Sequence, residues 1–250
     1  MISFLFVSVT YSQSYNIEGD WYTEEKKAII TIYKTKIGLT DQERDLLIKE
    51  VYIQESKSKN LQYKNLNTAW TGDTQGHEFL FSNKKFEKLF RLIALNIKKY
   101  TKLLGINNDQ IDFFYQRAWA TISKSGENIQ LHRHRQSHLS FAYYLKKNKN
   151  DGSLNFHNKA LHNEIAPALF DLTNEKSKNF FKPIYDNANV MVVHPEADEI
   201  YIFPSKTPHS TSSNKTDEQR ISVSADISIF AKNAENVEQL ITPINKWLKF

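Results

Sequence analysis

The chain has 250 residues, with 33 Lys and Arg, 28 Asp and Glu, a formal net charge of +5 and no Cys. Without cysteine it cannot form a disulfide, a thiolate metal site, an iron–sulfur cluster or a thiol nucleophile, so any metal must bind His, Asp or Glu. Only six of the 33 basic residues are Arg. Such Lys-rich charge indicates a solvated surface, so we expect no nucleic-acid partner. No apolar run approaches the ~20 residues of a membrane span, and we expect a cytoplasmic protein without membrane contact.

The first third of the chain predicts two helices after an N-terminal strand. Residues 1–12 are rich in β-formers and favour a strand over a signal peptide. The run Thr40-Asp41-Gln42-Glu43 is a capping box, which predicts that a helix begins there. Ser82 can cap a second helix, whose apolar residues recur at helical spacing until Gly105 ends it.

From Ile111 the apolar period changes from helical to alternating, as in a β-strand. Strand-like segments cover residues 111–119, 128–136, 138–146, 153–157, 190–193, 199–203 and 219–230. Asn150-Asp151-Gly152 is a strong hairpin signal between two of them. Residues 160–188 interrupt the series, and we expect them to form a lid over one end of the domain.

Many short strands separated by turns are typical of a sandwich or barrel. We therefore predict an α+β protein with a double-stranded β-helix (jelly-roll) core and its N-terminal helices packed outside. One domain would span residues 1–250, with a helical part over about 1–110 and the jelly-roll over about 111–231. An amphipathic helix over about 236–250 would complete it.

Three histidines predict a metal site. His132 and His134 are two residues apart, so in a strand both side chains point to the same face. His209 lies 75 residues further on, after a separate strand. Two ligands from one strand and one from another form a facial triad that leaves coordination positions open. Such a site suits Fe(II) best, and its ligand types also allow Zn(II), Mn(II) or Ni(II).

Arg220 and Ser222 alternate onto the polar face of the strand that follows His209. A guanidinium with a hydroxyl beside it is suited to binding the far carboxylate of a metal-chelated dicarboxylate. Tyr144 and Ser140 share the face of the histidine strand and are further candidates for holding this co-substrate. Weaker candidates for the pocket wall are His138, Arg117 and Trp119.

These motifs resemble those of a 2-oxoglutarate/Fe(II) oxygenase family. Residues 128–144 are similar to N-x-x-x-H-x-H-x-x-S-x-x-S-G-x-Y-Y, and residues 202–209 and 220–224 to F-P-S-x-x-x-H … R-I-S-x-S. A weaker similarity at 65–71 extends the resemblance to residues 65–226. It implies a double-stranded β-helix dioxygenase that uses Fe(II), 2-oxoglutarate and O2, most often as a hydroxylase, on a small-molecule or peptidyl substrate. A homodimer is left open.

The chain departs from the family pattern at two positions. Ala142 replaces a Gly, and His134 stands where related oxygenases have Asp or Glu. Three neutral ligands leave the iron one charge more positive than a carboxylate would. Alternatively, one of the two histidines is not a ligand, and water or a carboxylate from elsewhere, such as Glu196, Asp198 or Asp151, completes the site.

A cupin is the alternative interpretation. Gly126, five residues and then His132-x-His134 match the opening of the first cupin metal motif, although His138 stands about where its Glu is expected. A cupin would be a His-ligated metalloenzyme or small-molecule binder that does not use 2-oxoglutarate. The two interpretations differ at Arg220.

Overall fold

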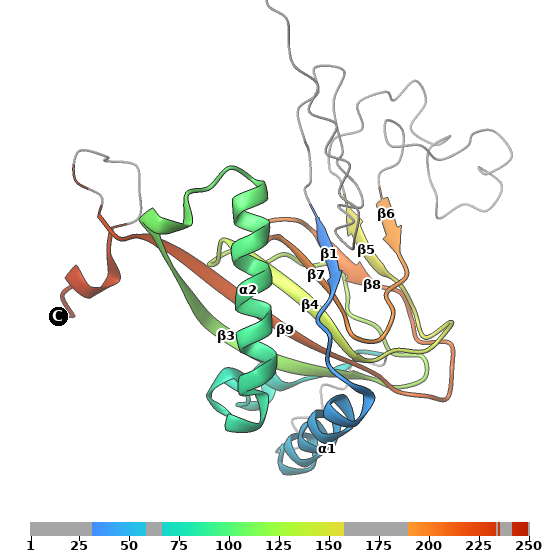
Figure 1. Cartoon of the computed structure of the whole chain (residues 1–250). Coiled ribbons are helices and arrows are strands. Elements are labelled where there is room, and N and C mark those ends of the chain that lie inside the picture. The colour runs from blue at the N-terminus through green and yellow to red at the C-terminus, as the bar shows by residue number, and fades with distance from the viewer. Residues whose placement is uncertain (1–31, 59–66, 158–189, 234, 236–241, 250) are drawn as a thin grey trace, which may run out of the picture.

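The computed structural model describes residues 32–58, 67–157, 190–233, 235 and 242–249. Two antiparallel sheets form its framework, the larger in the order β1-β7-β4-β9-β3-β2 and the smaller β6-β5-β8. The strands are β1 (Tyr33–Lys36), β2 (Trp70–Thr71), β3 (Ile111–Ser123), β4 (Leu139–Lys146), β5 (Leu154–His157), β6 (Val190–Val193), β7 (Glu199–Pro204), β8 (His209–Thr211) and β9 (Arg220–Ala231). Figure 1 shows helix α2 crossing one face of the long strands β3, β9 and β4.

The two predicted helices are α1 (Asp41–Lys57) and α2 (Glu87–Leu103). The capping box at α1 is confirmed, since Thr40 Oγ1 accepts the Glu43 N–H at 3.2 Å and Glu43 accepts the Thr40 N–H at 3.0 Å. The cap predicted at Ser82 is wrong. Two 3₁₀ turns, Leu80–Ser82 and Lys84–Phe86, precede α2 and delay its start to Glu87.

The alternation of β9 separates the apolar core from the functional face. Ile221, Val223 and Ala225 are fully buried in the cluster that includes Leu89 and Ile93 of α2. Burying each large aliphatic side chain stabilises the fold by roughly 1.5–3 kcal/mol. The intervening residues Arg220, Ser222, Ser224 and Asp226 face the opposite way, toward the smaller sheet. A second cluster, which includes Phe156, Phe203 and Tyr144, packs on that side.

Several expectations differ from the structure. Residues 128–136 are not a regular strand, because β-bridges occur there only at Asn128 and at His132. The sequence did not predict the short strands β1, β2 and β8. The N-terminal strand and the lid over 160–188 lie outside the described residues. The described part of the expected C-terminal helix, 242–249, contains only a 3₁₀ turn, Ile244–Lys246. Within the described ranges no helix combines the length and apolar character needed to cross a lipid bilayer.

Candidate metal centre

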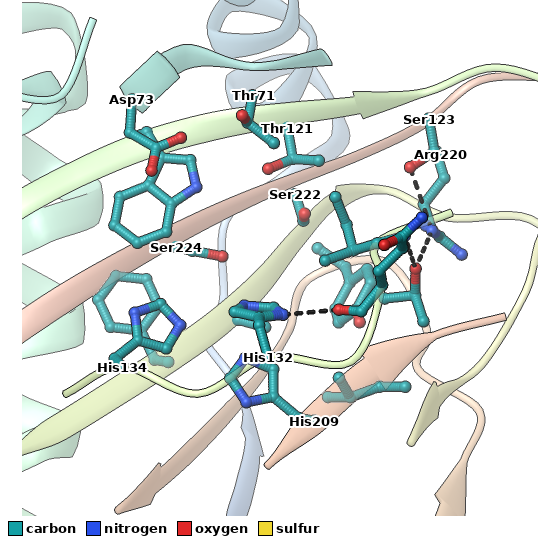
Figure 2. A pocket seen from close by; sticks show the side chains of 18 of the residues that line it. Thr71, Asp73, Thr121, Ser123, His132, His134, His209, Arg220, Ser222 and Ser224 are labelled. Carbon is teal, nitrogen blue, oxygen red and sulfur yellow. Dashed lines mark hydrogen bonds between the residues drawn. The ribbon is translucent and has the colours of Figure 1, made fainter. Parts of the chain in front are cut away.

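A cavity of about 440 Å³ lies on the polar face of the large sheet. Its floor is formed by three adjacent strands, because β9 pairs with β3 on one side and with β4 on the other. The segment 129–134 and strand β8 complete the wall. Figure 2 shows the histidines at one end of this cavity and Arg220 at the other, with Ser224 near His134 and Ser222 nearer Arg220.

The structure brings His132, His134 and His209 together. One ring nitrogen from each lies within 4.8 Å of the other two. Although His132 is outside a regular strand, its N–H and C=O pair with those of His209 at 3.0 and 2.9 Å. The His134 N–H donates to the Ser205 carbonyl at 3.0 Å. These backbone bonds give the segment the extended pairing that places two imidazoles beside a third.

The second ring nitrogen of each histidine has a partner that orients the ring. Nδ1 of His132 lies 2.8 Å from the Gln130 carbonyl, and Nδ1 of His209 lies 2.9 Å from the Thr207 carbonyl. Nδ1 of His134 lies 2.6 Å from Asp226 Oδ1, a short electrostatic contact that is not aligned as a standard hydrogen bond. Metal-binding histidines characteristically use one nitrogen in this way, so each Nε2 remains available as a ligand.

Partial removal from water keeps two of the imidazoles in the form that binds metals, although His132 is still exposed at the edge of the cluster and, of these two, only His209 is buried. This desolvation lowers the pKa of His132, and it lowers the pKa of His209 to about 3, with a further contribution from the nearby charge of His132. Both rings are therefore neutral near pH 7, and a neutral imidazole can bind a cation without first losing a proton.

Aromatic packing fixes the ring planes. Trp119 stacks on His134 with ring centroids 5.7 Å apart, and the Arg117 guanidinium covers Trp119 at 4.8 Å. Phe203 contacts the His209 ring edge to face at 4.8 Å. Rings held in this way bind a metal with little loss of side-chain freedom.

At the other end of the cavity, Arg220 is a buried cation, 3% exposed. Its Nη1 donates to the Asp151 carbonyl at 2.7 Å, and its Nη2 donates to Ser123 Oγ at 3.1 Å and Thr211 Oγ1 at 2.9 Å. All of these acceptors are neutral. Among the described residues no carboxylate forms an ion pair with Arg220, although a buried charge is costly unless it is paired. Its position therefore favours an anionic ligand.

Hydroxyl groups around Arg220 have hydrogens that are not donated to any described residue. Thr211 Oγ1 accepts from both Arg220 and the Ile129 N–H, so its own hydrogen must point elsewhere. The Tyr144 hydroxyl lines the cavity and makes no hydrogen bond with a described residue, and burial raises its pKa. Ser222 and Thr121 also line this wall. Together they provide neutral O–H donors around one cation, a combination suited to a carboxylate.

Asp226 is a site residue that the sequence did not single out. It lies on the same face of β9 as Arg220, opposite Arg117 of β3. Burial alone would raise the pKa of Asp226, but contacts with His134 and Arg117 outweigh it and lower the pKa to about 2. The alternation of β9 already put Asp226 on the cavity face, which was the available signal.

Other predicted residues fall in different places. Arg117 and Trp119 line the cavity, as do Tyr144 and Ser222. Ser140 does not, because its hydroxyl bonds to Ser205 and Asp226 at 2.8 and 3.1 Å. His138 is also outside, where its Nδ1 accepts the Ile229 N–H at 3.0 Å beyond the end of the cavity-facing row.

None of the three carboxylates suggested as an additional ligand contacts the histidines. Glu196 is exposed and pairs with Lys36 at 3.0 Å. Asp198 accepts the N–H groups of Gly38 and Leu39, and Asp151 pairs with Lys147.

Comparison with solved structures defines the class of fold. The non-heme alpha ketoglutarate dependent epimerase SnoN from nogalamycin biosynthesis aligns with a TM-score of 0.52 and 14% identity over 82% of each chain. The carbocyclase SnoK from the same biosynthesis aligns at 0.50 and 10%, over 84% of this chain and 87% of SnoK. The predicted α+β fold with a double-stranded β-helix core is confirmed.

Residues 117–226 match the profile of the family described as "Putative 2OG-Fe(II) oxygenase". The matched segment carries the three histidines and Arg220. The resemblance, the enzyme class and the cofactors Fe(II) and 2-oxoglutarate are thereby confirmed, and the class implies O2 and an organic substrate. A search of curated proteins finds no significant match.

Proposed function

We propose that the chain is an Fe(II)/2-oxoglutarate-dependent dioxygenase that hydroxylates a small-molecule or peptidyl substrate. His132, His134 and His209 would hold the iron. Arg220 and Ser222 would hold the distal carboxylate of 2-oxoglutarate. The observation that carries this proposal is that one cavity holds a three-imidazole cluster and a buried arginine that has no carboxylate partner among the described residues.

The residues of the cavity fit both groups. The Nδ1 atoms of the three histidines are engaged, which leaves one coordinating nitrogen on each ring. At the far end, Arg220 offers charge while Thr211 and Tyr144 offer hydroxyl donors. Hydrogen bonds from charged groups are roughly twice as strong as neutral ones, so Arg220 would dominate the recognition.

The overall reaction would convert substrate R–H, 2-oxoglutarate and O2 into R–OH, succinate and CO2. Bound iron and 2-oxoglutarate supply the oxidising chemistry. The protein contributes position and charge: it fixes three ligands on one side of the metal, neutralises the co-substrate tail and leaves the remaining cavity to the substrate. A cupin-type binder would not need a buried cation opposite the metal, so Arg220 favours the oxygenase.

Anaerobic titration with Fe(II) and then 2-oxoglutarate tests the proposal. We expect a weak visible charge-transfer band that requires both components. The band should disappear in His209→Ala, which loses a ligand, and should need much more 2-oxoglutarate in Arg220→Gln. A metal-dependent band that is indifferent to 2-oxoglutarate would instead support the cupin alternative, and absence of metal uptake would exclude both.

We extend the proposal to the protein as a whole. A single oxygenase-like domain would span residues 1–250, in the cytoplasm, with no nucleic-acid or membrane partner; a homodimer stays open. The Lys-rich charge and the absence of cysteine support this view. Size-exclusion chromatography with light scattering would give the oligomeric state, and limited proteolysis would test the single domain.

A further inference from the structure

Asp226 differs from the other groups behind the histidines because it carries a charge. His132 and His209 each contact a neutral backbone carbonyl through Nδ1. Of the three, only His134 faces a carboxylate belonging to a described residue, with 2.6 Å between its Nδ1 and Asp226 Oδ1. Asp226 is 3% exposed, so little water screens its charge.

The surroundings of Asp226 leave it only partly neutralised. Its Oδ2 accepts from Arg117 Nε at 2.6 Å, and its Oδ1 also accepts from the hydroxyls of Ser137 and Ser140 at 3.2 and 3.1 Å. Arg117 is shared, since its Nη1 also pairs with Asp73 at 3.2 Å. Two carboxylates and one guanidinium leave one excess negative charge next to His134.

The excess negative charge of Asp226 lies beside a set of metal ligands that carries no negative charge of its own. Three neutral imidazoles do not compensate the charge of a divalent cation. A carboxylate behind a metal-bound histidine fixes its tautomer and makes the ring a stronger ligand. Trp119 stacks on the His134 ring and keeps it oriented between Asp226 and the metal position.

We propose that Asp226 and His134 act together as the anionic ligand of the metal centre, with Asp226 supplying, one ring away, the charge that a directly bound carboxylate would give. This inference rests on the proposed three-histidine metal site and deepens it. Asp226 is thus a positioning residue: it touches neither metal nor substrate and acts through the orientation and electron density of His134. Arg117 opposes it by drawing on the same carboxylate.

Co(II) titration of the metal-free protein under anaerobic conditions tests the inference, with the visible Co(II) bands reporting occupancy. Asp226→Asn keeps the shape of the side chain and removes its charge. Loss of such a partner typically weakens metal binding about 10- to 100-fold, and we expect a dissociation constant raised by that factor. Asp198→Asn is the matched control, since it removes another buried carboxylate, which bonds Gly38, Leu39 and Tyr143.

Arg117→Gln gives the opposite test. Removing the cation frees the charge of Asp226, so Co(II) binding should become several-fold tighter, on the order of what one partly screened charge contributes. If Asp226 and Arg117 only stabilised the local structure, both substitutions would weaken binding. Changes of opposite sign therefore distinguish the proposed role from a structural one. Should Asp226→Asn fail to fold, the direction of the Arg117→Gln change decides the question alone.

The outcomes separate this inference from the proposed function. Wild-type uptake of Co(II) with an unchanged dissociation constant in Asp226→Asn would overturn the inference and leave the metal site standing. Weaker binding in Arg117→Gln would also overturn it. A wild-type protein that takes up no Co(II) would overturn the metal site itself, and this inference with it.

Discussion

Arg220 and Arg117 lie at opposite ends of the same cavity face, one on β9 and one on β3, yet their surroundings differ. Arg117 has a half-exposed side chain (41%) and pairs with two carboxylates, Asp226 and Asp73. Arg220 is 3% exposed, and in the part of the chain that the structure describes it donates to neutral oxygens only. Under the proposed function, the charge of Arg117 is balanced within the protein and the charge of Arg220 is left for the co-substrate.

The contrast between Arg117 and Arg220 shows how charge balance can indicate a binding site. Water solvates an exposed arginine, which therefore needs no ion pair. A buried arginine without an ion pair costs the fold free energy. In the described ranges the carboxylates lie at the exposed Arg117 and none lies at the buried Arg220, which is unexpected for a purely structural role. An incoming dicarboxylate would complete the arrangement at Arg220.

The largest effect is expected from Arg220→Gln. Charge-assisted hydrogen bonds contribute about 1.5–3 kcal/mol, so we expect the dissociation constant of 2-oxoglutarate to rise roughly 10- to 100-fold. Isothermal titration into the Ni(II)-loaded protein would measure it. Arg220→Lys keeps the charge but not the planar guanidinium, so its dissociation constant should lie between those of the wild type and Arg220→Gln. If Arg220→Gln bound 2-oxoglutarate as wild type does, the two arginines would not differ in function.

Gly152→Ala should disturb Arg220 without touching its side chain chemistry. A Cβ at Gly152 would lie 2.3 Å from Arg220 Nη1 and 2.5 Å from the Ser212 carbonyl, at a φ of +105°. We expect 2-oxoglutarate to bind about ten-fold more weakly, with unfolding made easier by about 1–3 kcal/mol. Gly38→Ala is the control, because φ is +88° there and the space is open. Gly38→Ala should have the same backbone strain but leave the affinity for 2-oxoglutarate unchanged. Equal affinities for 2-oxoglutarate in Gly38→Ala and Gly152→Ala would contradict the steric explanation.

Local sequence patterns predicted much of this arrangement. The alternation of residues 220–226 placed Arg220 and Ser222 on one face, and the capping box at Thr40 marked the start of α1. These features depend on neighbours in sequence, which fix backbone geometry over short distances. Alternation along the histidine strand likewise placed Ser140 and His138 on the same face as His134. Neither lines the cavity, because a shared face does not determine which groups a side chain contacts.

Features that depend on distant pairing were missed. Strand β1 exists because Tyr33–Lys36 pairs with β7, and β8 because it pairs with β5, so neither short segment has a pattern of its own. Residues 128–136 were predicted as a strand, but only His132 forms a bridge with β8. Asp226 was likewise recognisable as a residue on the polar face of β9 but not as the partner of His134.

Tyr144→Phe should have a smaller effect than either change at Arg220. Its hydroxyl has no hydrogen bond to a described residue, so its removal leaves no protein partner unsatisfied. A single neutral hydrogen bond contributes about 0.5–1.5 kcal/mol, and we expect 2-oxoglutarate to bind roughly 3- to 10-fold more weakly. Tyr201→Phe is the control, since that hydroxyl donates to Glu199 at 3.1 Å. A loss confined to Tyr201→Phe would place the carboxylate elsewhere.

Arg117→Gln should have the smallest effect on 2-oxoglutarate. Its guanidinium is satisfied by Asp226 and Asp73, and a half-exposed charge at the other end of the cavity is screened by water. We expect a dissociation constant within about two-fold of wild type, the usual range for a change of ±0.5 kcal/mol. The same titration, run in Ni(II)-loaded protein saturated with metal, removes any contribution from altered metal affinity. A loss as large as that of Arg220→Gln would mean that the co-substrate tail lies at the Arg117 end, and the two arginines would exchange roles.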